Sequence, residues 1–165
     1  HCSTPHLDEE EIRARFVKAY NILAADKTQL LDDCRIIQTS LSDCSALDTE
    51  IPALQEEMDV VAGLIRKCVE ENTRDAQNQS EYGARYNGYV ERYEAAQTKL
   101  EELQREQAIR QAKADSIGAF MFAISEQDAL TDFDAKLWTA IICSVTVHSD
   151  GRVVFLFMTG AEIEV

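Results

Sequence analysis

The stretch LDTEIPALQEEMDVVAGLIRKCVEEN, residues 47–72, repeats apolar side chains at alternating intervals of four and three residues. This spacing predicts a helix whose apolar side chains form one narrow seam, as in a coiled coil. Its seam positions are Leu47, Ile51, Leu54, Met58, Val61, Ile65, Cys68 and Asn72. Because a proline is tolerated in the first turn of a helix, Pro52 predicts that this helix begins near Thr49 or Ile51.

A second stretch with the same spacing follows a short polar interruption. Asn78, followed three residues later by Glu81, is typical of a capping box and predicts a new helix there. Its seam positions are Tyr82, Tyr86, Tyr89, Tyr93, Ala96, Leu100, Leu103 and Gln107. Two such helices joined by a short polar segment predict an antiparallel hairpin with its turn between Asn72 and Gln79.

The segment before this hairpin is also predicted to be helical. Asp8 with Glu11 three residues later predicts a capped helix start, and apolar residues then recur at helical spacing as far as Leu41. The stretch from Ser42 to Ser45 predicts an interruption. The pattern near Asp26 leaves open whether the helix bends there.

The last forty residues change character. Thr131 or Asp132 could cap a short helix, residues 134–142, and two alternating apolar runs follow it. Asp150-Gly151 between these runs predicts a β-hairpin with a type I′ turn or a bulged relative. Thr159-Gly160 suggests a second turn before a short strand, residues 162–165. A meander this small needs support, so we expect it to pack on the first helix and on the helix that carries Trp138.

These elements predict a mainly α fold with a small β meander (α+β), in which a long antiparallel coiled-coil hairpin projects from a compact base. Three segments are expected: 1–45 as the N-terminal helical part of the base, 46–125 as the coiled-coil arm with its turn near 72–79, and 126–165 as the short helix and β meander that complete the base. An arm of about 30 residues per helix would extend about 45 Å.

The charge of the chain limits what it can bind. Thirty acidic and sixteen basic residues give a net charge of -14, which argues against binding of a nucleic-acid backbone or of an anionic membrane. No apolar run approaches the roughly 20 residues of a membrane span. The five cysteines include no C-x-x-C pair and indicate a reducing compartment.

The sequence offers few candidates for chemistry. Four tyrosines, Tyr82 to Tyr93, most simply pack along the hairpin seam, although Tyr82 near the turn could instead be exposed to a partner. His148 is expected to be a solvated residue beside the hairpin turn. His6 and Cys2 could share a metal, but two ligands do not make a structural zinc site. The residues therefore predict no active site and no cofactor, and they favour an interaction device.

Three stretches together resemble the large serine recombinases, the serine integrase and resolvase superfamily. CSTPHLDEEEIRARFVKAYNIL, residues 2–23, is similar to the junction that follows the family's zinc ribbon. EYGARY, residues 81–86, resembles the E-Y-x-x-R-Y phrase of the family's coiled-coil arm. FDAKLWTAIICSVTVHSDGRVVFLFMTGAEIEV, residues 133–165, is similar to its C-terminal phrase, F-D-x-x-L-W followed by a V-T-V strand and a D-G-x-V-x-F hairpin.

The resemblance implies a role and a longer parent protein. Cys2 would be the last zinc ligand of a ribbon whose other ligands lie upstream, so zinc belongs to the parent and is not expected here. The catalytic serine would also lie upstream, and nothing in the chain matches its Tyr-x-Arg-x-Ser motif. The arm would contact other recombinase subunits during synapsis and influence the direction of recombination, through residues near its turn: Asn72, Arg74, Tyr82 and Arg85.

The resemblance further implies a bacterial, cytoplasmic protein of a mobile element or prophage. The parent would bind attachment-site DNA, whereas this part alone should bind DNA weakly or not at all. Two other classes compete with this interpretation. A free-standing coiled-coil scaffold or chaperone-like module would have no upstream catalytic domain. An enzyme using Cys34 or Cys143 is disfavoured, because both cysteines sit in apolar patterns of the sequence.

Overall fold

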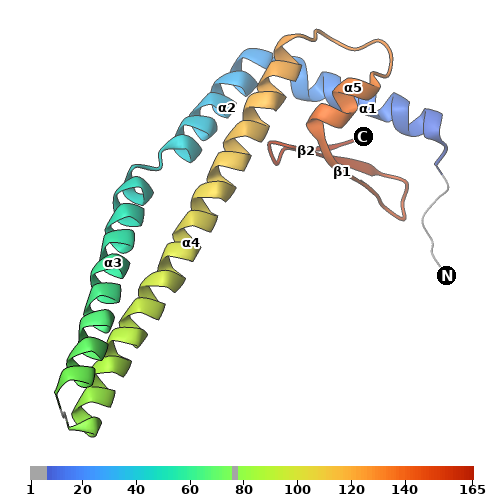
Figure 1. Ribbon diagram of the computed structural model, residues 1–165. Coiled ribbons are helices and arrows are strands. Elements are labelled where there is room, and N and C mark those ends of the chain that lie inside the picture. The colour runs from blue at the N-terminus through green and yellow to red at the C-terminus, as the bar shows by residue number, and fades with distance from the viewer. Residues whose placement is uncertain (1–6, 76–77) are drawn as a thin grey trace. The chain divides into compact units, whose positions relative to one another are not determined.

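The computed structural model describes residues 7–75 and 78–165, which form a mainly helical chain with a small antiparallel sheet (Figure 1). This confirms the predicted class, mainly α with a small β meander. The helices are α1 (Glu9–Leu23), the 3-10 helix η1 (Ala24–Asp26), α2 (Lys27–Ser42), α3 (Ser45–Arg74), α4 (Gln79–Ser125) and α5 (Ala135–Ile141). The strands are β1 (Ile142–Val147), β2 (Val153–Phe157) and β3 (Glu162–Glu164).

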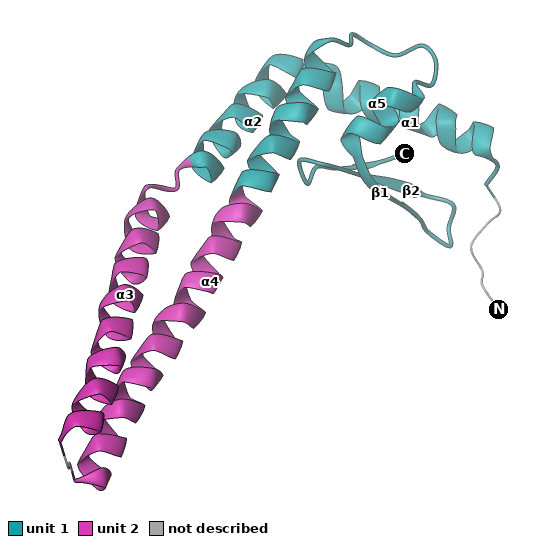
Figure 2. Cartoon of the chain, in the orientation of Figure 1, with its two compact units in different colours: residues 1–42, 111–165 teal, residues 43–110 magenta. Residues whose placement is uncertain are grey.

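The chain divides into two compact units, coloured separately in Figure 2. Unit 1 comprises residues 1–42 and 111–165, and unit 2 comprises residues 43–110. Helix α4 contributes to both units. Residues 111–125 of α4 belong to unit 1, where Ile117, Phe120 and Ile124 are buried in the core, whereas the predicted arm extends to residue 125.

At several helix starts, an aspartate side chain accepts a hydrogen bond from a backbone amide in the first turn. The Asp8 side chain accepts from the Glu11 amide at 2.7 Å and caps α1, as predicted. Between α1 and α2 the chain tightens into η1, and the Asp26 carboxylate accepts from the Gln29 amide at 3.1 Å. Asp134 caps α5 by accepting from the amides of Lys136 and Leu137. The expected caps at Thr131 or Asp132 are wrong, because the Thr131 hydroxyl donates to the Asp132 side chain instead.

The start of α3 was also predicted wrongly. The helix begins at Ser45, well before Thr49, because the Asp43 carboxylate accepts from the Ser45 amide at 3.3 Å and from its hydroxyl at 2.8 Å. Pro52 therefore lies beyond the first turn. Its ring nitrogen carries no hydrogen, so the helix forgoes one hydrogen bond at that point.

Unit 1 is built around one core to which helices and sheet both contribute. Phe16 of α1 is fully buried, and its ring centroid lies 5.0 Å from Trp138 and 6.2 Å from Phe155. Strand β2 alternates between buried and half-buried residues, so one of its faces points into this core. The core also includes Tyr20, Cys34, Ile117, Phe120, Ile124, Leu137, Ile141, Val153 and Phe157. The meander thus packs on α1 and α5, as expected.

The sheet has the strand order β1-β2-β3 and is antiparallel throughout. At the first turn the Gly151 amide donates to the His148 carbonyl at 3.0 Å, and Gly151 has a φ of 89°. This geometry is the bulged relative of the two predicted turns. Gly160, with a φ of 87°, forms the second predicted turn. Positive φ at both positions favours glycine.

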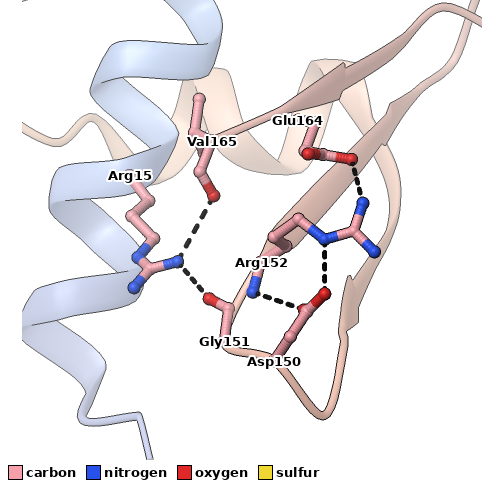
Figure 3. A network of polar contacts seen from close by, with 6 residues as sticks. All are labelled: Arg15, Asp150, Gly151, Arg152, Glu164 and Val165. Atoms are coloured by element: carbon pink, nitrogen blue, oxygen red, sulfur yellow. Dashed lines mark hydrogen bonds and ion pairs between the residues drawn. The ribbon is translucent and has the colours of Figure 1, made fainter.

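Arg15 of α1 joins the helix to the sheet (Figure 3). Its guanidinium donates to the Gly151 carbonyl at 2.6 Å and to the Val165 carbonyl at 3.3 Å. On the other side of the turn, Arg152 donates to Asp150 and to Glu164, at 2.7 and 2.9 Å. These two arginines satisfy the carbonyls and carboxylates at the hairpin turn and at the last residue.

Candidate functional site

The two helical segments of unit 2, α3 and the first part of α4, contact each other in opposite directions. Gln79 donates to Asn72 at 3.2 Å, Arg92 to Glu57 at 2.8 Å, and Gln107 to Asp48 at 2.9 Å. The Arg110 guanidinium donates to the Asp43 carbonyl at 2.9 Å. Residue numbers rise along α4 as they fall along α3, so the contacts are antiparallel.

Burial in unit 2 follows the four-and-three spacing. Its buried hydrophobic residues, within the part of the chain that the structure describes, are Leu47, Val61, Cys68, Ala96 and Leu103. All five lie at predicted seam positions, and the remaining seam residues are half-buried. The seam is therefore where α3 and α4 bury their apolar side chains.

The four predicted contact residues lie where α3 ends and α4 begins, an end that we call the tip (residues 72–75 and 78–85). The Asn72 side-chain oxygen accepts from Gln79, which ties the two helices together. Arg74 is exposed and lines a shallow hollow of about 590 Å³ together with Arg66, Lys67 and Glu70. Tyr82 is half-buried, and its ring centroid lies 6.0 Å from that of Tyr86.

Arg85 has contacts within the chain. Its guanidinium lies 3.4 Å from the Glu71 carboxylate. The pKa of Arg85 is raised above its usual value, first by a hydrogen bond with Cys68 and then by neighbouring groups that include Glu71. Arg85 thus connects α4 to α3, whereas Arg74 is exposed and is the better placed of the two to meet a partner.

The two flanks of the seam differ in charge, a feature that the spacing of the seam does not predict. On one flank, which we call the ion-paired flank, Glu57 and Glu71 of α3 pair with Arg92 and Arg85 of α4. Part of the signal was present in the sequence, because Arg85, Arg92 and Lys99 recur at intervals of seven after the turn, while Glu57 and Glu71 lie fourteen residues apart before it, with Leu64 between them. Opposite charges at such flanking positions set the orientation of paired helices.

The opposite flank carries no ionisable side chain between Gln55 and Val69 on α3 and between Gly83 and Gln97 on α4, and we call this part the uncharged flank; the preceding position in the series, Asp48, is charged and accepts from Gln107. Its members recur at intervals of seven on the other side of the seam: Gln55, Ala62 and Val69 on α3, and Gly83, Val90 and Gln97 on α4. A hollow of about 420 Å³ opens beside it, lined by Ala62, Ile65, Arg66 and Tyr93. Val69 is 40% exposed there.

Cys34, one of the two cysteines considered as a nucleophile, lacks the setting for that role. Cys34 is buried in the core of unit 1, and burial raises its pKa, with a smaller contribution from Asp33. A raised pKa keeps the thiol protonated, the opposite of what a nucleophile needs. Cys143 is exposed, contrary to the apolar pattern in which it was placed, because the pairing of β1 with β2 shifts register between Ile142 and Ser144.

Metal binding finds no support in the described residues. Across residues 7–75 and 78–165, no three or more His, Cys, Asp or Glu side chains gather in a way that could hold a metal ion. Cys2 and His6 lie outside the described residues. A single thiolate from Cys2 would supply one of the four ligands of a structural zinc site.

None of the helices in the described part of the chain combines the length and the apolar character needed to cross a membrane. Comparison of the chain with protein-family models, with curated proteins and with solved structures finds no match. The resemblance to serine recombinases therefore rests on the three stretches quoted above.

Proposed function

We propose that the chain is the C-terminal, non-catalytic part of a bacterial serine recombinase, and that α3 and α4 form a coiled-coil arm. The arm would bind the arm of another recombinase subunit, which would favour synapsis of the correct sites and influence the choice between integration and excision. The catalytic serine and the zinc ribbon would belong to the parent protein.

The observation that carries this proposal is the antiparallel contact between α3 and α4. Its buried residues lie at the four-and-three spacing, and oppositely charged residues pair on one flank. Two helices paired in this way present a long surface, which suits contact with another protein. The net charge of -14 also supports a role in protein contacts over one in DNA binding.

The open reading frame that contains the chain tests this proposal directly. We expect it to encode, upstream of His1, a cysteine-rich ribbon that Cys2 completes and a domain with a Tyr-x-Arg-x-Ser motif. Purified parent protein should then recombine DNA that carries paired attachment sites, and replacement of that serine should abolish the reaction. A reading frame that starts near His1, with neither domain, would refute the recombinase and favour a free-standing coiled-coil scaffold or chaperone-like module.

A further inference from the structure

The uncharged flank differs from the rest of this acidic surface. Glu57 and Glu71 face Arg92 and Arg85 on the ion-paired flank, whereas the uncharged flank offers only small, apolar and amide side chains. Its hollow leaves Ala62, Ile65 and Tyr93 partly accessible. A high net charge opposes contact between two copies of a protein, so an uncharged surface is where they can approach most closely.

The charges that border this flank on α3 are arranged symmetrically. Asp59 lies three residues before Ala62 and Arg66 lies four residues after it, so both are neighbours of Ala62 on the helix surface. None of the ion pairs formed by residues 7–75 and 78–165 includes Asp59 or Arg66. Both side chains are exposed.

These features match a second copy of the same surface in the opposite direction. If a twofold axis passes beside Ala62, α3 of one copy runs antiparallel to α3 of the other. Arg66 of each copy then lies opposite Asp59 of its partner copy, and Val69 lies opposite Gln55. The small side chain of Ala62 meets its own equivalent and permits close approach of the two helices.

The other possible arrangement is less favourable. If the two copies ran in the same direction, α3 of one would lie on α4 of the other. The antiparallel contacts within unit 2 place Asp59 about level with Glu94. That arrangement would therefore bring two carboxylates together twice, which costs free energy. The charges thus select the antiparallel arrangement.

We propose that the uncharged flank is a self-association surface on which a second copy of this chain binds about a twofold axis at Ala62, giving four paired helices. This inference deepens the proposed function, since it rests on contact between two arms and names the surface and the direction of that contact. Isologous contacts of this kind are the usual way in which soluble proteins dimerise.

Disulfide trapping tests the geometry. Cys2, Cys44 and Cys143 are replaced by serine, and Ala62→Cys is introduced into the 165-residue chain. Because Ala62 lies at the axis, mild oxidation should give a covalent dimer in high yield. Val60→Cys is the matched control: Val60 is 53% exposed on the same helix but lies outside the flank, so it should stay monomeric. Equal dimer yields from both variants, or no dimer from Ala62→Cys, would overturn the proposal.

Charge exchange tests the direction. In sedimentation equilibrium, Arg66→Glu should weaken the dimer by roughly tenfold or more, because it places carboxylates opposite each other. The double variant Asp59→Arg/Arg66→Glu should restore association, since the pair is merely reversed. No restoration, with helicity unchanged by circular dichroism, would refute the antiparallel arrangement. These measurements use no DNA, so they test self-association separately from the recombinase function. If the chain dimerises but its reading frame encodes no recombinase domain, only the proposed recombinase function is refuted. If the parent is a recombinase but the chain stays monomeric, only the self-association surface is refuted.

Discussion

Nε of Arg92 on α4 lies 2.8 Å from a carboxylate oxygen of Glu57 on α3, so these two distant parts of the sequence are level in unit 2. Gln79 with Asn72 and Gln107 with Asp48 define the same register towards either end. Exposed ion pairs contribute about 0–1 kcal/mol each, so this pair specifies alignment more than it stabilises the fold. The buried seam supplies most of the stability.

This register predicts which residues can be crosslinked. The three contacts place the partner of Met58 between residues 91 and 97 of α4, and Ala96 is the buried seam residue in that range. Met58→Cys/Ala96→Cys should therefore form an intramolecular disulfide once the native cysteines are replaced. Faster migration on a non-reducing gel would report the crosslink. The control pair Met58→Cys/Leu103→Cys is displaced by two helical turns, about 10 Å, and should stay reduced. Efficient crosslinking of the control alone would show that the register is shifted.

The hydrogen bonds of Arg15 are expected to contribute to the stability of unit 1. Arg15→Met keeps much of the apolar stem but leaves the Gly151 and Val165 carbonyls without this donor. Loss of hydrogen bonds to a half-buried charged group should lower the free energy of unfolding by about 2 kcal/mol. Chemical denaturation followed by Trp138 fluorescence measures it, because Trp138 packs in the core of unit 1.

Arg35→Met is the matched control for Arg15. The Arg35 side chain is 63% exposed, and its ion pair is with Asp32 on the same helix, so its loss should change the stability by less than about 0.5 kcal/mol. Equal effects of the two substitutions would show that the carbonyl contacts of Arg15 contribute little.

The charge of the chain predicts its behaviour towards DNA. We expect the 165-residue chain to give no salt-sensitive shift of a short duplex at low micromolar concentration, because acidic residues outnumber basic residues by 30 to 16. A gel shift at two salt concentrations measures this. Binding that weakens steeply as salt rises would show a basic DNA-contacting surface, and the arm would then belong to the DNA-binding machinery.

Local signals in the sequence predicted much of the secondary structure. Asp8 and Asn78 mark helix starts because their side chains accept from nearby amides, and Gly151 marks a turn because it adopts a positive φ. The seam could be read from its spacing alone. The start of α3 could not, because Pro52 suggested a later start, whereas the helix begins at Ser45, beside the hydrogen bonds that Ser45 donates to Asp43.

The candidate site was less predictable than the fold. The resemblance predicts Arg85 and Arg74 alike as partner contacts near the turn. Only tertiary structure shows that Arg85 reaches Glu71 and Cys68, whereas Arg74 does not. The members of the uncharged flank could be recognised in the sequence by their spacing of seven residues. Its contrast with the other flank appears only in the structure, which shows the ion pairs there.

The last prediction concerns the tip in the parent recombinase. Arg74 is exposed, so Arg74→Glu should leave folding nearly unchanged. Tyr82→Ala removes the ring beside Tyr86 and should cost about 1 kcal/mol, a local loss that the long seam can tolerate. If the tip makes a subunit contact, both variants should bind single attachment sites normally yet impair synapsis or alter the choice between integration and excision, because few residues carry most of the energy of such an interface.

The assay compares recombination of paired sites with gel shifts on single sites. Met58→Ala is the control, because it weakens the half-buried seam away from the tip and should leave recombination intact if stability alone is not limiting. Arg85→Glu is a less specific probe, since it also breaks the contacts with Glu71 and Cys68. Normal recombination by Arg74→Glu and Tyr82→Ala in both directions would show that the tip makes no necessary contact, and equal loss of single-site binding would place the arm in the DNA-binding fold.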